Sequence, residues 1–218
     1  FFSIPTGRFV IGSIARLHHY KGFETVFCAI ANLPETVREN IIYFIGGVGP
    51  DRAELEEITK TLGITKQVRW QGFIPEERLP DFYRACNVFV LCTQENIRAR
   101  EVEGFGLVFL ESQACGTPVI GTRCGGIPDA IVENVGVWLI TPDDHQELVK
   151  KIAHFIACPE QLQQQRALAR DRILKFCTWD KYVYQLLSSI KKNIGMSSAV
   201  IDKINGVTVV IPTLEREV

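Results

Sequence analysis

The sequence predicts an α/β fold: an open, doubly wound parallel sheet of about six strands, followed by C-terminal helices. Two observations support this fold class. Short apolar segments alternate with segments of helical spacing over most of the chain. The apolar segments are also continuous, as in residues 41–45, which indicates strands buried on both faces. Because strands that alternate with helices pair in parallel through right-handed crossovers, we expect a doubly wound sheet.

Six segments are short, rich in Val, Ile or Phe, and bounded by turn-forming residues, so each is predicted as a strand. In chain order they are residues 9–14, 41–45, 68–72, 88–92, 118–121 and 135–140. Sheets of this kind bind ligands beyond the carboxyl ends of their strands, at the point where the strand order reverses. The loops that follow the strands are therefore the places where chemistry is expected.

Segments with helical spacing separate these strands. In the first of them the apolar residues recur at i, i+3, i+4 and i+7, namely Phe23, Val26, Phe27 and Ile30. Pro34 ends that pattern. The later predicted helices are residues 51–62, 79–85, 107–115, 127–132 and 143–157. Strands and helices together predict a Rossmann-like domain.

The pattern changes toward the end of the chain. Residues 160–176 and 179–194 have the spacing of two polar, amphipathic helices with no strand between them. Residues 195–206 have the composition of a linker, and residues 207–213 form an isolated apolar strand. We therefore expect one domain over residues 1–194.

Charge and composition exclude several classes of protein. The chain has 218 residues, with 24 Lys and Arg against 25 Asp and Glu, so no attraction to nucleic acid or an anionic membrane is expected. No apolar run reaches the roughly 18–20 residues of a membrane span. The first residues lack the features of a signal peptide. The seven cysteines form no CxxC pair, which favours free thiols in a reducing cytoplasm.

Two glutamates separated by seven residues, Glu103 and Glu111, form the most informative motif. If a helix begins near Gly106, its free N–H groups form an anion site after the fourth strand. Gly104 and Gly106 would let a ligand approach the main chain. Both carboxylates can then line one crevice and accept hydrogen bonds from sugar or ribose hydroxyls. The alternative is an ordinary amphipathic helix with two solvated glutamates.

Two cations flank the turn after the first strand. Arg16 and Lys21 are placed to hold a diphosphate and to stabilise the charge that develops on it as a leaving group. The alternative is that both are solvated loop residues.

Glycine-rich turns follow the second strand, at residues 46–49, and the fifth, at residues 125–126. Neither matches a dinucleotide fingerprint or a phosphate loop, so each is either a point of ligand approach or a plain tight turn. The four histidines have no catalytic partner beside them in the sequence, and no carboxylate cluster has the spacing of metal ligands.

In combination these motifs are far more specific than any one of them. They occur in the order of residues 12–22, 46–50, 68–73, 103–111, 114–120 and 125–128. This order resembles the C-terminal half of a retaining glycosyltransferase of family 4, which has the two-domain GT-B fold. The resemblance covers about residues 6–193. It implies transfer of a sugar from a nucleotide-diphosphate donor to a saccharide or lipid, with retained configuration and without a metal or another cofactor.

The resemblance also implies roles for individual residues. Arg16 and Lys21 would grip the diphosphate, and together with Glu103 they form the expected catalytic set. Glu103 and the amides that follow it would hold the sugar and the adjacent phosphate, Glu111 would bind the ribose, and the main chain after Gly72 would meet the base. The expected donor-binding residues are Gly12, Ser13, Arg16, Lys21, Gly47, Phe73, Ile74, Glu103, Gly104, Phe105, Gly106, Leu107 and Glu111.

The resemblance further implies partners outside this sequence. The expected partners are a nucleotide-sugar donor and a separate N-terminal acceptor-binding domain, through which the protein could associate with a membrane. Residues 207–213 resemble the opening strand of a family 2 glycosyltransferase of GT-A fold, so residues 207–218 are expected to begin a second such domain. By itself the fragment is expected to bind donor but to transfer little.

Two other functions fit the same residues. One is a nucleotide-sugar epimerase or phosphorylase of the same architecture, which the combination of Arg16, Lys21 and the segment 103–106 disfavours. The other is a non-catalytic module that binds a nucleotide-sugar.

Overall fold

The computed structural model of the chain describes residues 2, 4–95, 101–133 and 136–194. A first compact unit ends at Asp171, and a second begins at Arg172. The first unit contains a six-stranded sheet in the order β3-β2-β1-β4-β5-β6, with every neighbouring pair parallel. The strands are β1 (Phe9–Ile14), β2 (Ile41–Gly46), β3 (Val68–Gly72), β4 (Val88–Leu91), β5 (Val119–Thr122) and β6 (Val137–Ile140). The predicted fold class, a doubly wound parallel α/β sheet, is confirmed.

The strand order reverses between β1 and β4. From β1 the chain proceeds outward through β2 to β3, and then returns to the other side of β1 as β4. Ile11 and Gly12 of β1 pair with Val88 and Phe89 of β4. The carboxyl ends of these two strands are therefore neighbours, and they define the switch point at which such sheets bind ligands.

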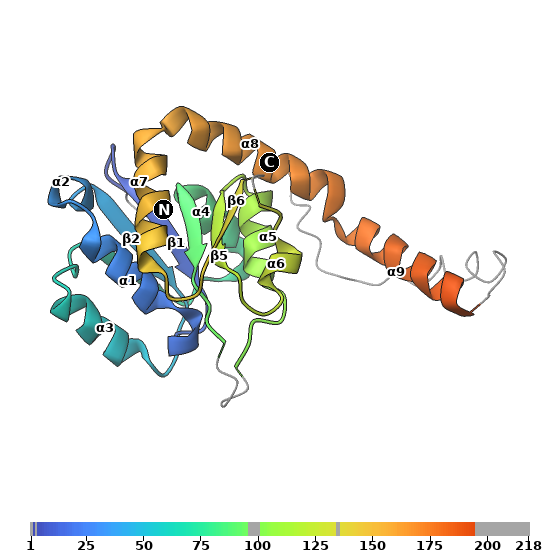
Figure 1. Cartoon of the computed structure of the whole chain (residues 1–218), viewed down its shortest axis with the longest axis horizontal. Coiled ribbons are helices and arrows are strands. Elements are labelled where there is room, and N and C mark those ends of the chain that lie inside the picture. The colour runs from blue at the N-terminus through green and yellow to red at the C-terminus, as the bar shows by residue number, and fades with distance from the viewer. Residues whose placement is uncertain (1, 3, 96–100, 134–135, 195–218) are drawn as a thin grey trace. The chain divides into compact units, whose positions relative to one another are not determined.

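Helices cover both faces of the sheet (Figure 1). Helices α1, α3 and α7 pack on one face, and α4, α5 and α6 pack on the other. Their bounds are α1 (Phe23–Asn32), α3 (Arg52–Thr61), α4 (Leu79–Ala85), α5 (Leu107–Ala114), α6 (Ile127–Ala130) and α7 (His145–Ala157). Strands such as β2 and β4 are apolar along their whole length because they are buried on both sides, whereas the edge strand β3 is mostly only partly buried.

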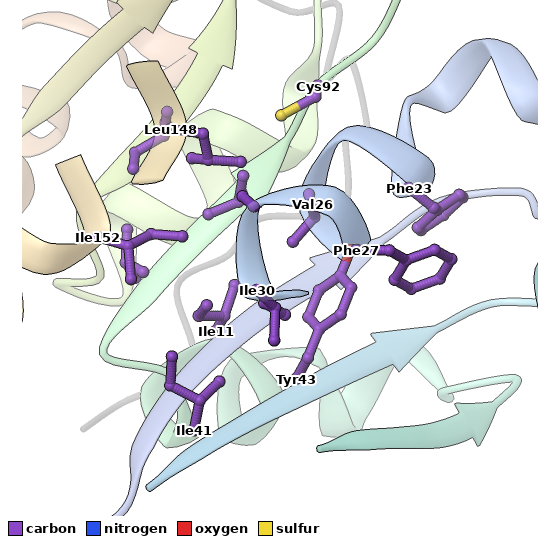
Figure 2. Close-up of a cluster of buried hydrophobic side chains, with 14 of the residues drawn as sticks. Ile11, Phe23, Val26, Phe27, Ile30, Ile41, Tyr43, Cys92, Leu148 and Ile152 are labelled. Atoms are coloured by element: carbon purple, nitrogen blue, oxygen red, sulfur yellow. The ribbon is translucent and has the colours of Figure 1, made fainter. Parts of the chain in front are cut away.

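The core on the first face forms between α1, α7 and the central strands. Figure 2 shows Val26, Phe27 and Ile30 of α1 directed toward the strand residues Ile11 and Tyr43. All five side chains are 0% exposed. The i, i+3, i+4, i+7 spacing of α1 thus corresponds to a fully buried helix face. The core on the other face is rich in aromatic rings, contributed by Phe82 and Tyr83 of α4, Phe89 of β4 and Phe109 of α5.

The described elements agree with the predicted ones to within one or two residues at most ends. Three single-turn helices were not predicted, because one turn is too short to show a period. They are η1 (His19–Lys21), α2 (Glu35–Arg38) and η2 (Glu76–Arg78). Helix α6 ends at Ala130, two residues earlier than predicted. The predicted linker 195–206 and the strand 207–213 lie outside the described residues.

Helices α8 (Pro159–Phe176) and α9 (Trp179–Ile194) follow the sheet, as predicted. Hydrogen bonds hold the first part of α8 to other elements of the first unit. Gln165 Oε1 accepts a 2.6 Å hydrogen bond from the N–H of Gly136, and Arg166 Nη1 donates at 3.0 Å to the carbonyl of Cys86. Of the helices in the described ranges, none combines the length and the apolar character that a membrane crossing requires.

Candidate functional site

A cavity of about 430 Å³ lies at the carboxyl ends of β1 and β4. Its walls come from the segments that follow these two strands, together with the start of α5. The lining residues are Ile14, Ala15, Arg16, Tyr20, Lys21, Leu91, Glu103, Gly104, Phe105, Gly106, Leu107 and Val108. Seven of the residues predicted to bind a donor are among them: Arg16, Lys21, Glu103, Gly104, Phe105, Gly106 and Leu107.

The loop after β1 delivers the two cations to this cavity. Arg16 is exposed, whereas the neighbouring Leu17 is fully buried and anchors the loop. Lys21 is the last residue of η1, and Gly22 follows in the left-handed conformation with φ +71°. A Cβ at Gly22 would lie 1.8 Å from the carbonyl oxygen of Cys92, so only glycine fits between η1 and the end of β4. This close contact fixes the position of Lys21 at the switch point.

Lys21 and Glu103 form an ion pair in the cavity wall. The Lys21 Nζ–Glu103 Oε2 distance is 2.7 Å, and the side chains are only 12% and 16% exposed. Lys21 Nζ also lies 4.7 Å from the centroid of the Tyr20 ring. Since a partly buried pair is screened less than one in water, each charge strongly constrains the other.

Helix α5 begins at the cavity with an uncapped N-terminus. Gly106 is its N-cap, with φ +84° and no side-chain cap. The first N–H groups of a helix have no partner within the helix and carry a partial positive charge. A Cβ at Gly104 would meet no atom within 4 Å, so the main chain before α5 is open to close approach. The start of α5 therefore offers main-chain donors to an anion.

The glycine pair after β5 packs against the main chain that precedes α5. A Cβ at Gly125 would lie 2.4 Å from the carbonyl oxygen of Glu103, and one at Gly126 would lie 2.0 Å from that of Gly104. Residues 125–126 therefore form a packing surface for the backbone that precedes α5. The two alternatives predicted for this pair were a point of ligand approach and a plain tight turn, and neither includes this close packing of main chain on main chain.

The two glutamates of the motif lie in different surroundings. Glu103 precedes α5 and lines the cavity, so the seven residues between the two glutamates are not all helical. Glu111 lies within α5 and is not among the lining residues. Its Oε2 accepts a 2.6 Å hydrogen bond from the phenol of Tyr83 on α4. Sequence reasoning did not single out Tyr83, because it lies 28 residues away on another helix.

The remaining predicted residues also lie outside the cavity lining. Gly12 and Ser13 are buried within β1, where the Ser13 hydroxyl hydrogen-bonds Tyr43 Oη at 2.7 Å. Gly47 follows β2, and its N–H donates at 2.7 Å to the carbonyl of Gly72 at the end of β3. After β3, Phe73 is 74% exposed, whereas Ile74 is only 9% exposed.

Sequence reasoning also did not find the cluster of acidic side chains around His18 and His19, beside η1. The ring of His19 contacts two glutamates: Nδ1 hydrogen-bonds Glu24, and Nε2 lies 3.1 Å from Glu54 Oε2. The main-chain N–H of His19 donates to Asp51 Oδ2 at 2.8 Å. The bond to Glu24 raises the pKa of His19 above 6.5, against a smaller opposing effect of burial. His18 Nδ1 lies 3.3 Å from the same Asp51. In the part of the chain that the structure describes, no group of three or more His, Cys, Asp or Glu residues is arranged to hold a metal ion.

Several characterised enzymes are similar to this chain in sequence. The GDP-mannose-dependent alpha-(1-6)-phosphatidylinositol monomannoside mannosyltransferase of Mycolicibacterium smegmatis is 27% identical over 172 residues, which cover 79% of this chain and 45% of that protein. The D-inositol 3-phosphate glycosyltransferase of Corynebacterium diphtheriae is 35% identical over 151 residues, covering 67% of this chain and 33% of that protein. The chain therefore spans less than half the length of these relatives.

Solved structures show the same similarity in three dimensions. Anabaena HepE, in complex with UDP and glucose, matches with a TM-score of 0.67 and 25% identity, over 76% of this chain and 43% of that one. Sucrose-phosphate synthase from Thermosynechococcus elongatus matches with a TM-score of 0.75 and 25% identity, over 89% and 47%. Residues 2–172 match the family of glycosyl transferases group 1. The chain carries the GT-B type of α/β domain and belongs to this family of glycosyltransferases.

Proposed function

We propose that the chain is the donor-binding domain of a retaining, metal-independent glycosyltransferase of family 4. It binds a nucleotide-diphosphate sugar, whose sugar is moved to a hydroxyl of a saccharide or lipid held by a separate acceptor-binding domain. The observation that carries the proposal is the cavity at the β1–β4 switch point, in which Lys21, Glu103 and the N-terminus of α5 meet.

The diphosphate is assigned to the positive end of the cavity. Arg16 and Lys21 supply cationic side chains, and the start of α5 supplies main-chain N–H donors. These groups neutralise the charge that grows on the diphosphate as its bond to the sugar breaks. In this proposal they take over the role that a divalent cation has in other transferases.

The sugar and the nucleoside are assigned to the glutamates and the outer loops. Glu103, with the amides of Phe105, Gly106 and Leu107, holds the transferred sugar and the adjacent phosphate. Glu111 accepts hydrogen bonds from the ribose hydroxyls. The main chain at Phe73 and Ile74, beside Gly47, meets the base. Gly12 and Ser13 contribute through the strand that positions Arg16.

Two relatives support the class of donor. HepE was solved with UDP and glucose, and the Mycolicibacterium smegmatis relative is named as dependent on GDP-mannose. Their nucleobases differ, so the proposal names a nucleoside diphosphate sugar as a class. Both relatives are more than twice as long as the segment they share with this chain. The acceptor is therefore assigned to a second domain.

Isothermal titration calorimetry with UDP-glucose, GDP-mannose and ADP-glucose tests the proposal. At least one donor should bind, with the same affinity in EDTA as in Mg²⁺. Lys21→Met should weaken that binding by tenfold or more, as expected for loss of a charged hydrogen bond. Lys60→Met is the matched control, because Lys60 is exposed on α3, where it pairs with Glu57. A folded protein that binds none of the three donors contradicts the proposal.

Product analysis of the full-length protein separates the remaining alternatives. Transfer with retained anomeric configuration supports the proposal. An epimerised donor in the absence of acceptor indicates an epimerase, and phosphate-dependent cleavage of a saccharide indicates a phosphorylase. Donor binding without transfer to any acceptor indicates a non-catalytic module.

A further inference from the structure

We propose that Tyr83 is a positioning residue, which holds the carboxylate of Glu111 in the orientation that receives the donor ribose. The inference rests on the proposed function, in which Glu111 is the ribose ligand. Tyr83 is the third residue from the end of α4, and Glu111 lies on the neighbouring α5. Tyr83 Oη donates to Glu111 Oε2 at 2.6 Å, the length of a charge-assisted O–H···O⁻ bond.

Tyr83 is fixed independently of Glu111. Its side chain is 1% exposed and makes edge contacts with Phe82 and Phe89, at centroid distances of 5.8 and 5.5 Å. Its carbonyl oxygen accepts a 2.7 Å hydrogen bond from the hydroxyl of Thr117. Packing therefore holds the ring of Tyr83 in place, and this hydrogen bond holds its main chain. The flexible glutamate takes the direction that the phenol imposes, not the reverse.

The phenol can only donate to this carboxylate at neutral pH. Burial and the charge of Glu111 raise the pKa of Tyr83 well above its usual value, so the hydroxyl stays protonated. One oxygen of Glu111 is thereby engaged, and its second oxygen is left to accept from a ligand. Glu111 itself is only partly buried, and in this inference its second oxygen is the one that faces the ribose. A carboxylate held in this way is pre-oriented for a pair of neighbouring hydroxyls.

Tyr83→Phe tests this role when nucleotides with and without ribose hydroxyls are compared. The probes are UDP, GDP and ADP, each beside its 2′,3′-dideoxy form, with affinities measured by calorimetry. For the nucleotide that binds, Tyr83→Phe should weaken the ribose form by about tenfold. The affinity for the dideoxy form should change by less than twofold, because that form has no ribose hydroxyl that could donate to Glu111. A purely structural role would weaken both forms equally.

Tyr43→Phe is the matched control. Tyr43 is also fully buried, hydrogen-bonds Ser13 and does not line the cavity, so the variant removes the same atom from a core position. It should leave the ratio between ribose and dideoxy affinities at the wild-type value. If Tyr83→Phe also leaves that ratio unchanged, or lowers both affinities equally, the inference is wrong.

Two further outcomes separate this inference from the proposed function. Wild-type protein that binds none of the nucleotides contradicts both. Wild-type protein that binds ribose and dideoxy forms equally contradicts the role of Glu111, and with it that of Tyr83, while donor binding stands.

If Tyr83→Phe does not fold, wild-type protein labelled with 3-fluorotyrosine replaces it. Its Tyr83 ¹⁹F resonance should then shift with the ribose form and not with the dideoxy form, and equal shifts would overturn the inference.

Discussion

The main-chain N–H of Gly126 donates a 2.9 Å hydrogen bond to the carbonyl oxygen of Glu103. This bond joins the loop after β5 to the segment that carries the cavity glutamate. The two residues come from loops after neighbouring strands, β4 and β5, which are paired in the sheet. The position of Glu103 therefore depends on a loop that does not itself line the cavity.

Gly126→Ala should damage both stability and donor binding. The new Cβ would lie 2.0 Å from the carbonyl oxygen of Gly104, a backbone atom that cannot rotate away. We expect the free energy of unfolding to fall by about 1–3 kcal/mol, the usual cost of overpacking. Donor affinity should fall with it, because residues 103–104 must shift. Urea unfolding and calorimetry measure the two effects.

Gly104→Ala changes the other residue of the same close contact and should affect donor binding without affecting stability. Its Cβ would meet no atom within 4 Å, so the free energy of unfolding should stay within about 0.5 kcal/mol of the wild type. The methyl group would stand where a ligand approaches the main chain, so donor affinity should still fall. Unchanged donor affinity in Gly104→Ala would argue against contact at this position.

The Lys21–Glu103 pair should show strong coupling in a double-mutant cycle. Lys21→Met and Glu103→Gln each leave a partly buried charge without its partner, so each should destabilise the fold by about 1–3 kcal/mol. The double variant should lose less than the sum of the two. Thermal and urea unfolding of the four proteins gives the coupling, and strictly additive losses would contradict it. Lys60→Met and Glu57→Gln, an exposed pair on α3, should show no measurable coupling.

The stability of the fold should depend on the protonation of His19 as the pH rises above about 6.5. The pKa of His19 is raised in the folded chain above 6.5, chiefly by its bond to Glu24, with Glu54 and Asp51 adding to the effect. A raised pKa means that the contribution is fully present below about 6.5 and is lost as the pH rises through the folded value. The side chain is 42% exposed, so salt should weaken the effect.

Urea unfolding at pH 5.5 and 8.5 measures this contribution. The wild type should lose more stability than His19→Gln between the two values. His154→Gln, on α7 beside Gln161, serves as the control and should keep the wild-type difference. If the stability of His19→Gln shows the same pH dependence as that of the wild type, His19 does not contribute to it and the prediction is wrong.

The two fully buried cysteines should resist modification in the native state. All seven cysteines lie in the described part of the chain and are free thiols. Cys86 and Cys92 are 1% and 0% exposed, and burial raises the pKa of both thiols well above the usual range. Peptide mapping after treatment with iodoacetamide should find both unmodified, and both modified in urea. Cys158, which is half-buried, should react in the native protein.

The sequence was sufficient for the sheet and for most of the cavity. Runs such as Ile41–Gly46 are buried along their whole length, so composition and continuity identified them directly. Arg16, Lys21 and Glu103 were singled out because they lie in loops after predicted strands, whose carboxyl ends meet at one edge, and because the motifs together resemble a known family. Apolar continuity and position after a strand can both be read from short stretches of sequence. The parallel topology then brings the loops after the strands to one edge of the sheet.

What the sequence could not provide are contacts between segments far apart. The bond from Tyr83 to Glu111 joins two helices, and the acids around His19 come from α1 and from the start of α3. The role of Gly125 and Gly126 depends on a backbone more than 20 residues earlier. Such contacts depend on how helices pack on the sheet, and no local period encodes that packing.

Lys21 and Glu103 are 82 residues apart in the chain. Neither can reach the other until β4 has inserted beside β1, which closes a long loop and is slow in parallel sheets. If the cavity binds a nucleotide as proposed, we expect nucleotide affinity to be acquired late in folding, after β1, β2 and β3 have paired. A refolding experiment that follows both tryptophan fluorescence and nucleotide binding should see binding recover in the last phase.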